Sequence, residues 1–97
     1  MLYLRIFDNK ETDYLIKAIL TLESEEECKA FLEDVMTTKE ILDMSQRIHV
    51  ASLLKDKVVY SNISSLTGAS AATISRVNRC INYGSGGYEK VLEKMEK

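Results

Sequence analysis

The chain has 97 residues, of which 45% are hydrophobic and 29% charged, with a formal net charge of −2 at pH 7 and no proline. This length predicts a single domain over residues 1–97, and the composition suits a packed, nearly all-helical fold. Cys28 and Cys80 lack metal-ligand spacing and are typical of reduced thiols. The opening apolar run is short and contains Arg5, so we expect no secretory or membrane segment and a cytoplasmic location.

The first third of the chain predicts two amphipathic helices. Residues 1–10 alternate apolar and other side chains, which fits a short strand or an arm on a partner. From Asp13 an apolar stripe of helical spacing continues to about Leu22. Ser24–Glu27 is a capping box that starts a second helix ending near Met36. Carboxylates in the first turn of a helix are stabilised by the helix dipole. This explains the acidic group without a metal site, so we predict none here.

A third helix is predicted from about Thr38 to Lys55, where it forms a scaffold for the elements that follow. Thr37 and Glu40 repeat the spacing of a capping box. Its apolar positions follow helical spacing and include Ile41, Leu42, Met44, Ile48, Ala51, Leu53 and Leu54. His49, the single histidine, has no evident partner and is interpreted as a polar residue on the helix shoulder rather than a ligand or catalytic group.

The stretch from Val58 to Ile81 predicts two short helices joined at Gly68. Apolar residues recur at helical spacing on both sides of the glycine: Val59, Ile63 and Leu66, then Ile74, Val77 and Ile81. Glycine suits the left-handed residue that often ends a helix, and Ser70 stands where an N-cap is expected. The spacing predicts a helix-turn-helix over about residues 59–82. A plain two-helix corner with a solvated polar face has the same spacing.

The charge distribution favours a DNA-binding helix-turn-helix over a plain two-helix corner. Residues 45–82 carry five Lys/Arg against one Asp, a net +4, whereas residues 1–44 carry five against eleven, a net −6. A basic segment that coincides with a helix-turn-helix is typical of a phosphate-binding face, and small side chains allow close approach to base edges. The predicted DNA-binding residues are Ser70, Ala71, Ala72, Thr73, Ser75, Arg76, Arg79, Lys55 and Lys57.

The remaining residues complete a fold of five to six helices. The glycine-rich segment 82–87 ends the second helix of the helix-turn-helix, which would be its recognition helix. Residues 88–97 predict a last short helix. The apolar stripes of residues 12–36 are broad for so small a chain, which buries only part of its surface alone. We therefore expect a homodimer formed largely through residues 12–36, with two recognition helices about 34–36 Å apart.

With these residues in hand, the stretch from Phe31 to Tyr88 resembles the Trp-repressor superfamily and, within it, the YerC/YecD-type group. The segments that carry the resemblance are Arg47–Ala51 with Leu53 and Leu54, Thr67–Val77, Asn78–Gly84 and Gly86–Tyr88. The resemblance implies an all-α, intertwined helical homodimer that contains a helix-turn-helix. It also implies a DNA-binding transcriptional regulator.

The resemblance further implies a candidate effector pocket beside the recognition helix. Thr73 and Arg76 match positions that bind tryptophan in the Trp repressor. Val77 stands where that repressor has glycine, Cys80 replaces a serine, and Gln46 aligns with a pocket arginine, one place before Arg47. The candidate effector-pocket residues are therefore Gln46, Arg47, Thr73, Arg76, Val77 and Cys80. The three departures argue against tryptophan as corepressor and leave binding without a cofactor, or with another small molecule.

The function that these patterns favour is a sequence-specific DNA-binding transcriptional regulator. We expect it to act as a homodimer on double-stranded DNA, in the repressing mode and away from membranes. The alternative is a protein-interaction module on the same scaffold without DNA recognition, because the overall charge is acidic. An enzyme is not expected, since no Gly-rich phosphate loop follows a strand and no Cys–His or paired-carboxylate arrangement is evident.

Overall fold

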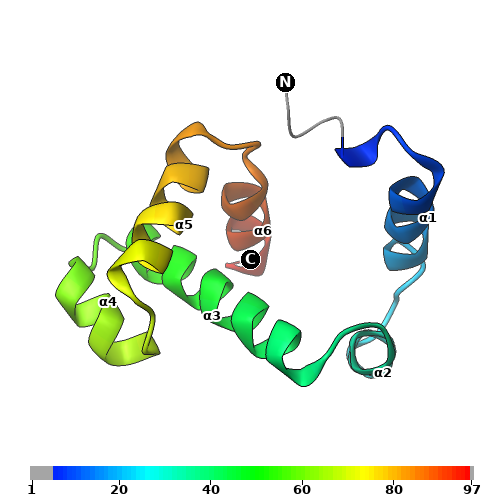
Figure 1. Ribbon diagram of the computed structural model, residues 1–97, viewed down its shortest axis with the longest axis horizontal. Coiled ribbons are helices and arrows are strands. Elements are labelled where there is room, and N and C mark those ends of the chain that lie inside the picture. The colour runs from blue at the N-terminus through cyan, green and yellow to red at the C-terminus, as the bar shows by residue number, and fades with distance from the viewer. Residues whose placement is uncertain (1–5, 97) are drawn as a thin grey trace. The chain divides into compact units, whose positions relative to one another are not determined.

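The computed structural model describes residues 6–96, which divide into two compact units (Figure 1). The N-terminal unit extends to Thr37 and the C-terminal unit begins at Thr38. Among the described residues there are six helices and no strand: α1 (Lys10–Ile19), α2 (Glu25–Val35), α3 (Thr38–Lys55), α4 (Tyr60–Thr67), α5 (Ala71–Tyr83) and α6 (Gly87–Met95). The all-α prediction of five to six helices is confirmed. None of the helices within residues 6–96 has both the length and the apolar character needed to cross a lipid bilayer.

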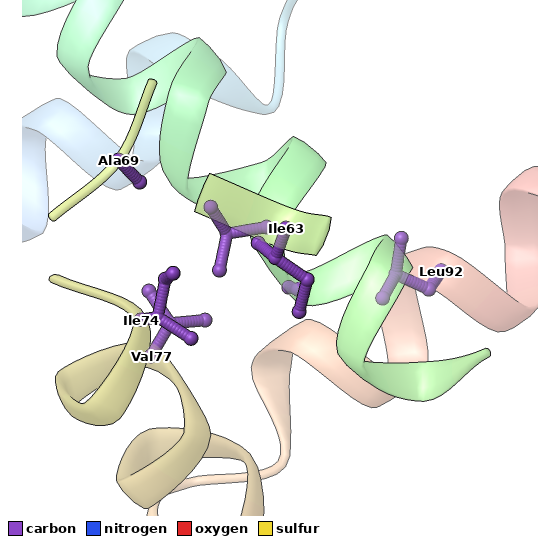
Figure 2. Close-up of a cluster of buried hydrophobic side chains, with 7 residues drawn as sticks. Ile63, Ala69, Ile74, Val77 and Leu92 are labelled. Atoms are coloured by element: carbon purple, nitrogen blue, oxygen red, sulfur yellow. The ribbon is translucent and has the colours of Figure 1, made fainter. Parts of the chain in front are cut away.

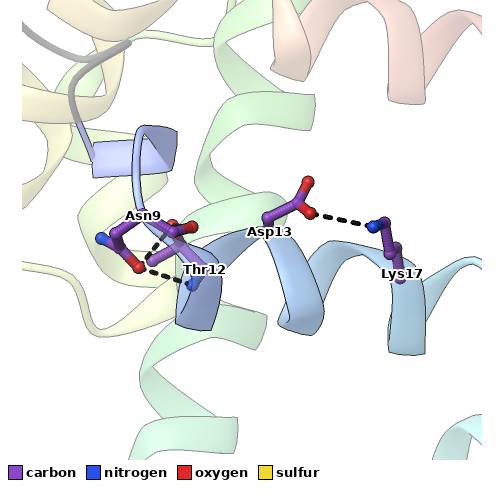
Figure 3. A network of polar contacts seen from close by, with 4 residues as sticks. All are labelled: Asn9, Thr12, Asp13 and Lys17. Atoms are coloured by element: carbon purple, nitrogen blue, oxygen red, sulfur yellow. Dashed lines mark hydrogen bonds and ion pairs between the residues drawn. The ribbon is translucent and has the colours of Figure 1, made fainter.

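In the N-terminal unit, α1 begins three residues earlier than its apolar stripe predicted. Asn9 caps the helix, because its side-chain oxygen accepts a hydrogen bond from the Thr12 amide at 2.9 Å (Figure 3). Asp13 and Lys17 form an exposed ion pair one turn apart, with a distance of 3.0 Å. Most of the alternating segment at residues 1–10 lies outside the described residues, and Ile6, which is described, lies in a short 3₁₀ turn.

The capping signal predicted for α2 is confirmed. The Ser24 hydroxyl oxygen accepts from the Glu27 amide at 3.1 Å, which satisfies one of the free amides at the helix start. The Glu27 carboxylate accepts from the Glu23 amide at 2.9 Å, one residue before the cap itself. The helix ends at Val35, with Met36 as its C-cap, as expected.

Neither α1 nor α2 has a buried side chain. Tyr14 is 77% exposed and Leu20 is 76% exposed, and Leu15, Ile16, Ile19 and Val35 are exposed as well. Of the predicted stripes, Ala18, Leu22, Phe31 and Leu32 are half-buried and the other members are exposed, so both helices keep apolar faces that the described chain covers only in part.

The C-terminal unit is built on α3, which contacts α4, α5 and α6. Its bounds are those that the sequence predicted. A single core forms where the four helices meet, and its members are 7% exposed or less: Val50, Ala51, Ile63, Ala69, Ile74, Val77 and Leu92 (Figure 2). The predicted stripe of α5 is confirmed, because Ile74 and Val77 are buried and Ile81 packs against the core.

The stripe predicted for α4 is only partly correct. Ile63 is fully buried, but Val59 is 60% exposed and Leu66 is 63% exposed. Val59 is the N-cap and has an extended backbone, so it precedes the helical spacing. The buried side of α4 runs from Ile63 to Thr67, and Leu66 lies roughly 80° away from it around the helix axis.

Candidate nucleic-acid interface

The turn between α4 and α5 has the geometry that its glycine predicted. Gly68 is left-handed, with φ 75° and ψ 4°, and its amide donates to the Ser64 carbonyl at 2.8 Å. A Cβ added at Gly68 would meet no atom within 4 Å. The requirement for glycine therefore comes from the backbone conformation and not from a crowded surrounding.

Ser70 starts α5 as an N-cap, as predicted. Its hydroxyl oxygen accepts from the Thr73 amide at 3.2 Å, and the hydroxyl donates to the Thr73 Oγ1 at 3.1 Å. The helix continues to Tyr83, two residues beyond the apolar row, and ends at Gly84.

The two faces of α5 differ in burial and in chemistry. Ile74 and Val77 are fixed in the core on one face. The side chains centred about 160° around the axis from that face are all exposed: Ala71, Ala72, Ser75, Arg76 and Arg79. Core packing therefore holds the row of small and basic residues toward solvent. Of the predicted DNA-binding residues on or beside α5, Ser70 is also exposed and Thr73 is half-buried.

The arginines of this face have no acidic partner among the described residues. Arg76 and Arg79 lie more than 4.0 Å from every described carboxylate, and the same holds for Arg47 and Lys57. Lys55 differs, because its ammonium is 3.6 Å from a carboxylate oxygen of Glu96. The exposed arginines are thus available to an anionic ligand, whereas Lys55 already has a partner.

Lys57 has an unusual backbone for its residue type. Its φ is 64°, and it follows α3 at the position that glycine most often occupies. The Val58 amide donates to the Leu53 carbonyl and the Lys57 amide donates to the Leu54 carbonyl, each at 3.0 Å. These two bonds define a Schellman motif, which satisfies the last carbonyls of α3.

The structure places the six candidate effector-pocket residues in different surroundings. Val77 is 1% exposed because its side chain is a core residue. The Gln46 amide donates to the Thr67 carbonyl at 3.1 Å. Arg47, Arg76 and Cys80 are exposed, and no hydrogen bond or ion pair joins any two of the six candidate residues.

A cavity of about 200 Å³ lies on the other flank of α5, where the end of α3 meets α5 and α6. Its lining includes Lys55 and Lys57 from the predicted DNA-binding set, together with Asn78, Asn82 and Tyr88. Sequence reasoning missed this cavity, because its walls come from three separate segments that only the fold brings together. Within residues 6–96 the His, Cys, Asp and Glu side chains form no group of three or more that could hold a metal ion.

These features define an all-helical protein in which a tight turn at Gly68 joins α4 to α5, and the capped α5 presents small and basic residues. The profile of the family described as Trp repressor protein matches residues 10–96. The uncharacterized protein YerC of Bacillus subtilis (strain 168) is 46% identical over 88 residues, which cover 91% of this chain and 85% of that protein. The chain belongs to the Trp repressor family.

Solved structures agree with this assignment. A TrpR-like protein from Eubacterium eligens ATCC 27750 superposes with a TM-score of 0.91 at 44% identity, covering 95% of each chain. A candidate Trp repressor from Staphylococcus aureus superposes with a TM-score of 0.90 at 41% identity, covering 95% of this chain and 92% of that one. The fold is therefore that of Trp-repressor-like proteins.

Proposed function

We propose that this protein is a sequence-specific, DNA-binding transcriptional regulator that acts as a homodimer and represses its targets. The observation that carries the proposal is the solvent-facing row of α5, with Arg76 and Arg79 unpaired among the described residues and no acidic residue in the sequence between Lys57 and Glu89. Membership of the Trp repressor family supports the same class of function.

The residues of α5 divide into two roles in this proposal. Arg76 and Arg79 neutralise phosphates, and Lys57 adds a further cation at the end of α3. Ala71, Ala72 and Ser75 lie at the start of the exposed row, where short side chains let the helix approach the base edges. Ser70 satisfies the Thr73 amide, so these two residues fix the start of the helix that approaches the duplex. Lys55 contributes less, because Glu96 competes for its ammonium.

The homodimer forms through the N-terminal unit, over about residues 12–36. The apolar faces of α1 and α2 support this, since neither helix buries a side chain in the described chain. Covering such faces is the usual driving force of an obligate dimer interface. Two-fold symmetry then presents two copies of α5 to successive major grooves.

The experiment that tests the proposal is selection of bound sequences from random duplex DNA, followed by affinity measurements over a range of salt. The expected motif has two-fold symmetry, with half-site centres separated by about 34–36 Å. Three phosphate contacts from each protomer predict a fall in affinity of about 10³-fold between about 50 and 200 mM salt. A dimer that shows no salt-sensitive duplex binding, and instead captures a protein partner, would refute DNA recognition.

A further inference from the structure

Side chains, rather than backbone alone, hold the turn between α4 and α5. The Ser64 hydroxyl donates to the Ala69 carbonyl at 2.9 Å. The Thr67 hydroxyl donates to the Ile63 carbonyl at 2.7 Å, and its oxygen accepts from the Ala69 amide at 3.1 Å. Ala69 itself is 2% exposed and sits in the core. These bonds satisfy backbone groups that lose their helical partners where α4 ends.

Gln46 ties this turn to the scaffold helix. It lies on α3, 21 positions before Thr67, and its Nε2 donates to the Thr67 carbonyl at 3.1 Å in a partly buried bond. Only the amide nitrogen of glutamine can donate to a carbonyl, so the partner fixes how the amide is oriented. We refer to Gln46, Ser64, Thr67 and Ala69 as the turn clamp.

The turn clamp acts where the direction of α5 is decided. The backbone between Gly68 and Ser70 sets the angle at which α5 leaves the turn. No side chain packs within 4 Å of where a Cβ of Gly68 would lie, so steric contact does not restrain that residue. The hydrogen bonds on either side of it supply the restraint.

We infer that Gln46 is a positioning residue for DNA recognition, which sets the angle of α5 through the turn clamp without a bound effector. This inference rests on the proposed function. A recognition helix that is already held at its binding angle has little conformational freedom left to lose when DNA binds. Affinity is therefore gained without a new DNA contact. Because the restraint comes from a side chain of the same protein, a small molecule is not needed to provide it.

Three substitutions at Gln46 separate its donor from its size. Gln46→Met keeps the length but cannot donate, and Gln46→Glu places an acceptor against the Thr67 carbonyl. Gln46→Lys restores a donor of comparable reach. Ser45→Ala is the matched control, because the Ser45 hydroxyl donates to the Ile41 carbonyl within α3 and does not contact the turn.

Duplex affinity is measured on the full-length protein well below its unfolding midpoint, so that all variants are folded. The Met and Glu variants are expected to bind about five- to tenfold more weakly for each protomer that loses its hydrogen bond, which is about 25- to 100-fold for the homodimer. The salt dependence stays the same, because no phosphate contact is lost. The Lys variant recovers the affinity without a steeper salt dependence, and Ser45→Ala binds like wild type. Adding the twenty amino acids leaves wild-type affinity unchanged.

Amide hydrogen exchange at Ala69, measured without DNA, reports how often the turn clamp opens. This measurement does not depend on the function of the protein. Faster exchange in the Met variant, together with weaker DNA binding, supports the inference. Unchanged DNA affinity with a lowered unfolding temperature shows a purely structural role and overturns the inference, while the proposed function stands. Strong activation of the wild type by an amino acid also overturns it. Absence of DNA binding by the wild type overturns the proposed function, and the inference with it.

Discussion

Replacing Lys57 by glycine is expected to stabilise the protein, although the change removes a whole side chain. Lys57 is exposed and has a φ of 64°, in the left-handed region where a Cβ is unfavourable. The Schellman motif after α3 imposes this conformation, because the Lys57 and Val58 amides both bond back into the last turn. Glycine adopts the same backbone without strain.

The size of the effect follows from two opposing terms. Left-handed backbone costs an ordinary L-residue about 1–2 kcal/mol, and glycine loses about 0.5–1 kcal/mol more backbone entropy on folding. The net gain for Lys57→Gly is therefore about 0.5–1 kcal/mol, which raises the unfolding temperature by about 2–8 °C in a domain of this size. Gly68 has the same conformation with a φ of 75° and open space around it, so Gly68→Ala is expected to lose a similar amount.

Thermal and urea unfolding measure the stabilities of the Lys57→Gly and Gly68→Ala variants. The protomer concentration is held fixed, because the stability of a dimer depends on concentration. Lys57→Ala is the control, since it removes the charged side chain but keeps the Cβ. If Lys57→Gly is no more stable than Lys57→Ala, strain at this position does not exist and the reasoning is wrong. A neutral Gly68→Ala would contradict it equally.

Three further predictions test the site, the core and the dimer. Arg79→Ala should lower the slope of log affinity against log salt by about 2, one contact from each protomer, whereas Ser75→Ala should change the selected DNA sequence and keep the slope. Ile63→Ala removes a fully buried side chain and should cost about 2–5 kcal/mol of unfolding free energy, measured by urea denaturation. Leu15→Lys should convert the dimer to monomers in sedimentation. If Leu15 were only a surface residue, the same change would alter stability by less than about 0.5 kcal/mol.

The sequence predicted those parts of the fold that local chemistry decides. Ser24 and Ser70 were recognisable as caps, and Gly68 as a left-handed helix end, because each signal depends on residues within three or four positions. The face that α5 buries follows from helical periodicity alone. For the same reason, the exposure of Arg76 and Arg79 was predictable.

Features that depend on distant residues, or on residues whose type gives no clear local signal, were not predictable in this way. The left-handed backbone of Lys57 results from bonds to the preceding helix, and lysine itself gives no signal for it. The bond from Gln46 to the Thr67 carbonyl spans 21 positions, so no local pattern indicates it, and the place of Gln46 in an effector pocket stays a prediction. Asn9 was a local signal that an apolar stripe starting later concealed.

The N-terminal unit shows that apolar periodicity predicts a helix with an apolar face, but does not say which surface covers that face. α1 and α2 have 10 and 11 residues, and helices shorter than about 12–15 residues are marginal in water without tertiary packing. Their caps and exposed ion pairs each contribute about 1 kcal/mol or less. Since neither helix has a fully buried side chain in the described chain, the proposed homodimer is expected to supply the packing that keeps them helical. Leu15→Lys should therefore lose far-ultraviolet helical signal together with the dimer, and a monomer of undiminished helicity would contradict this role of the interface.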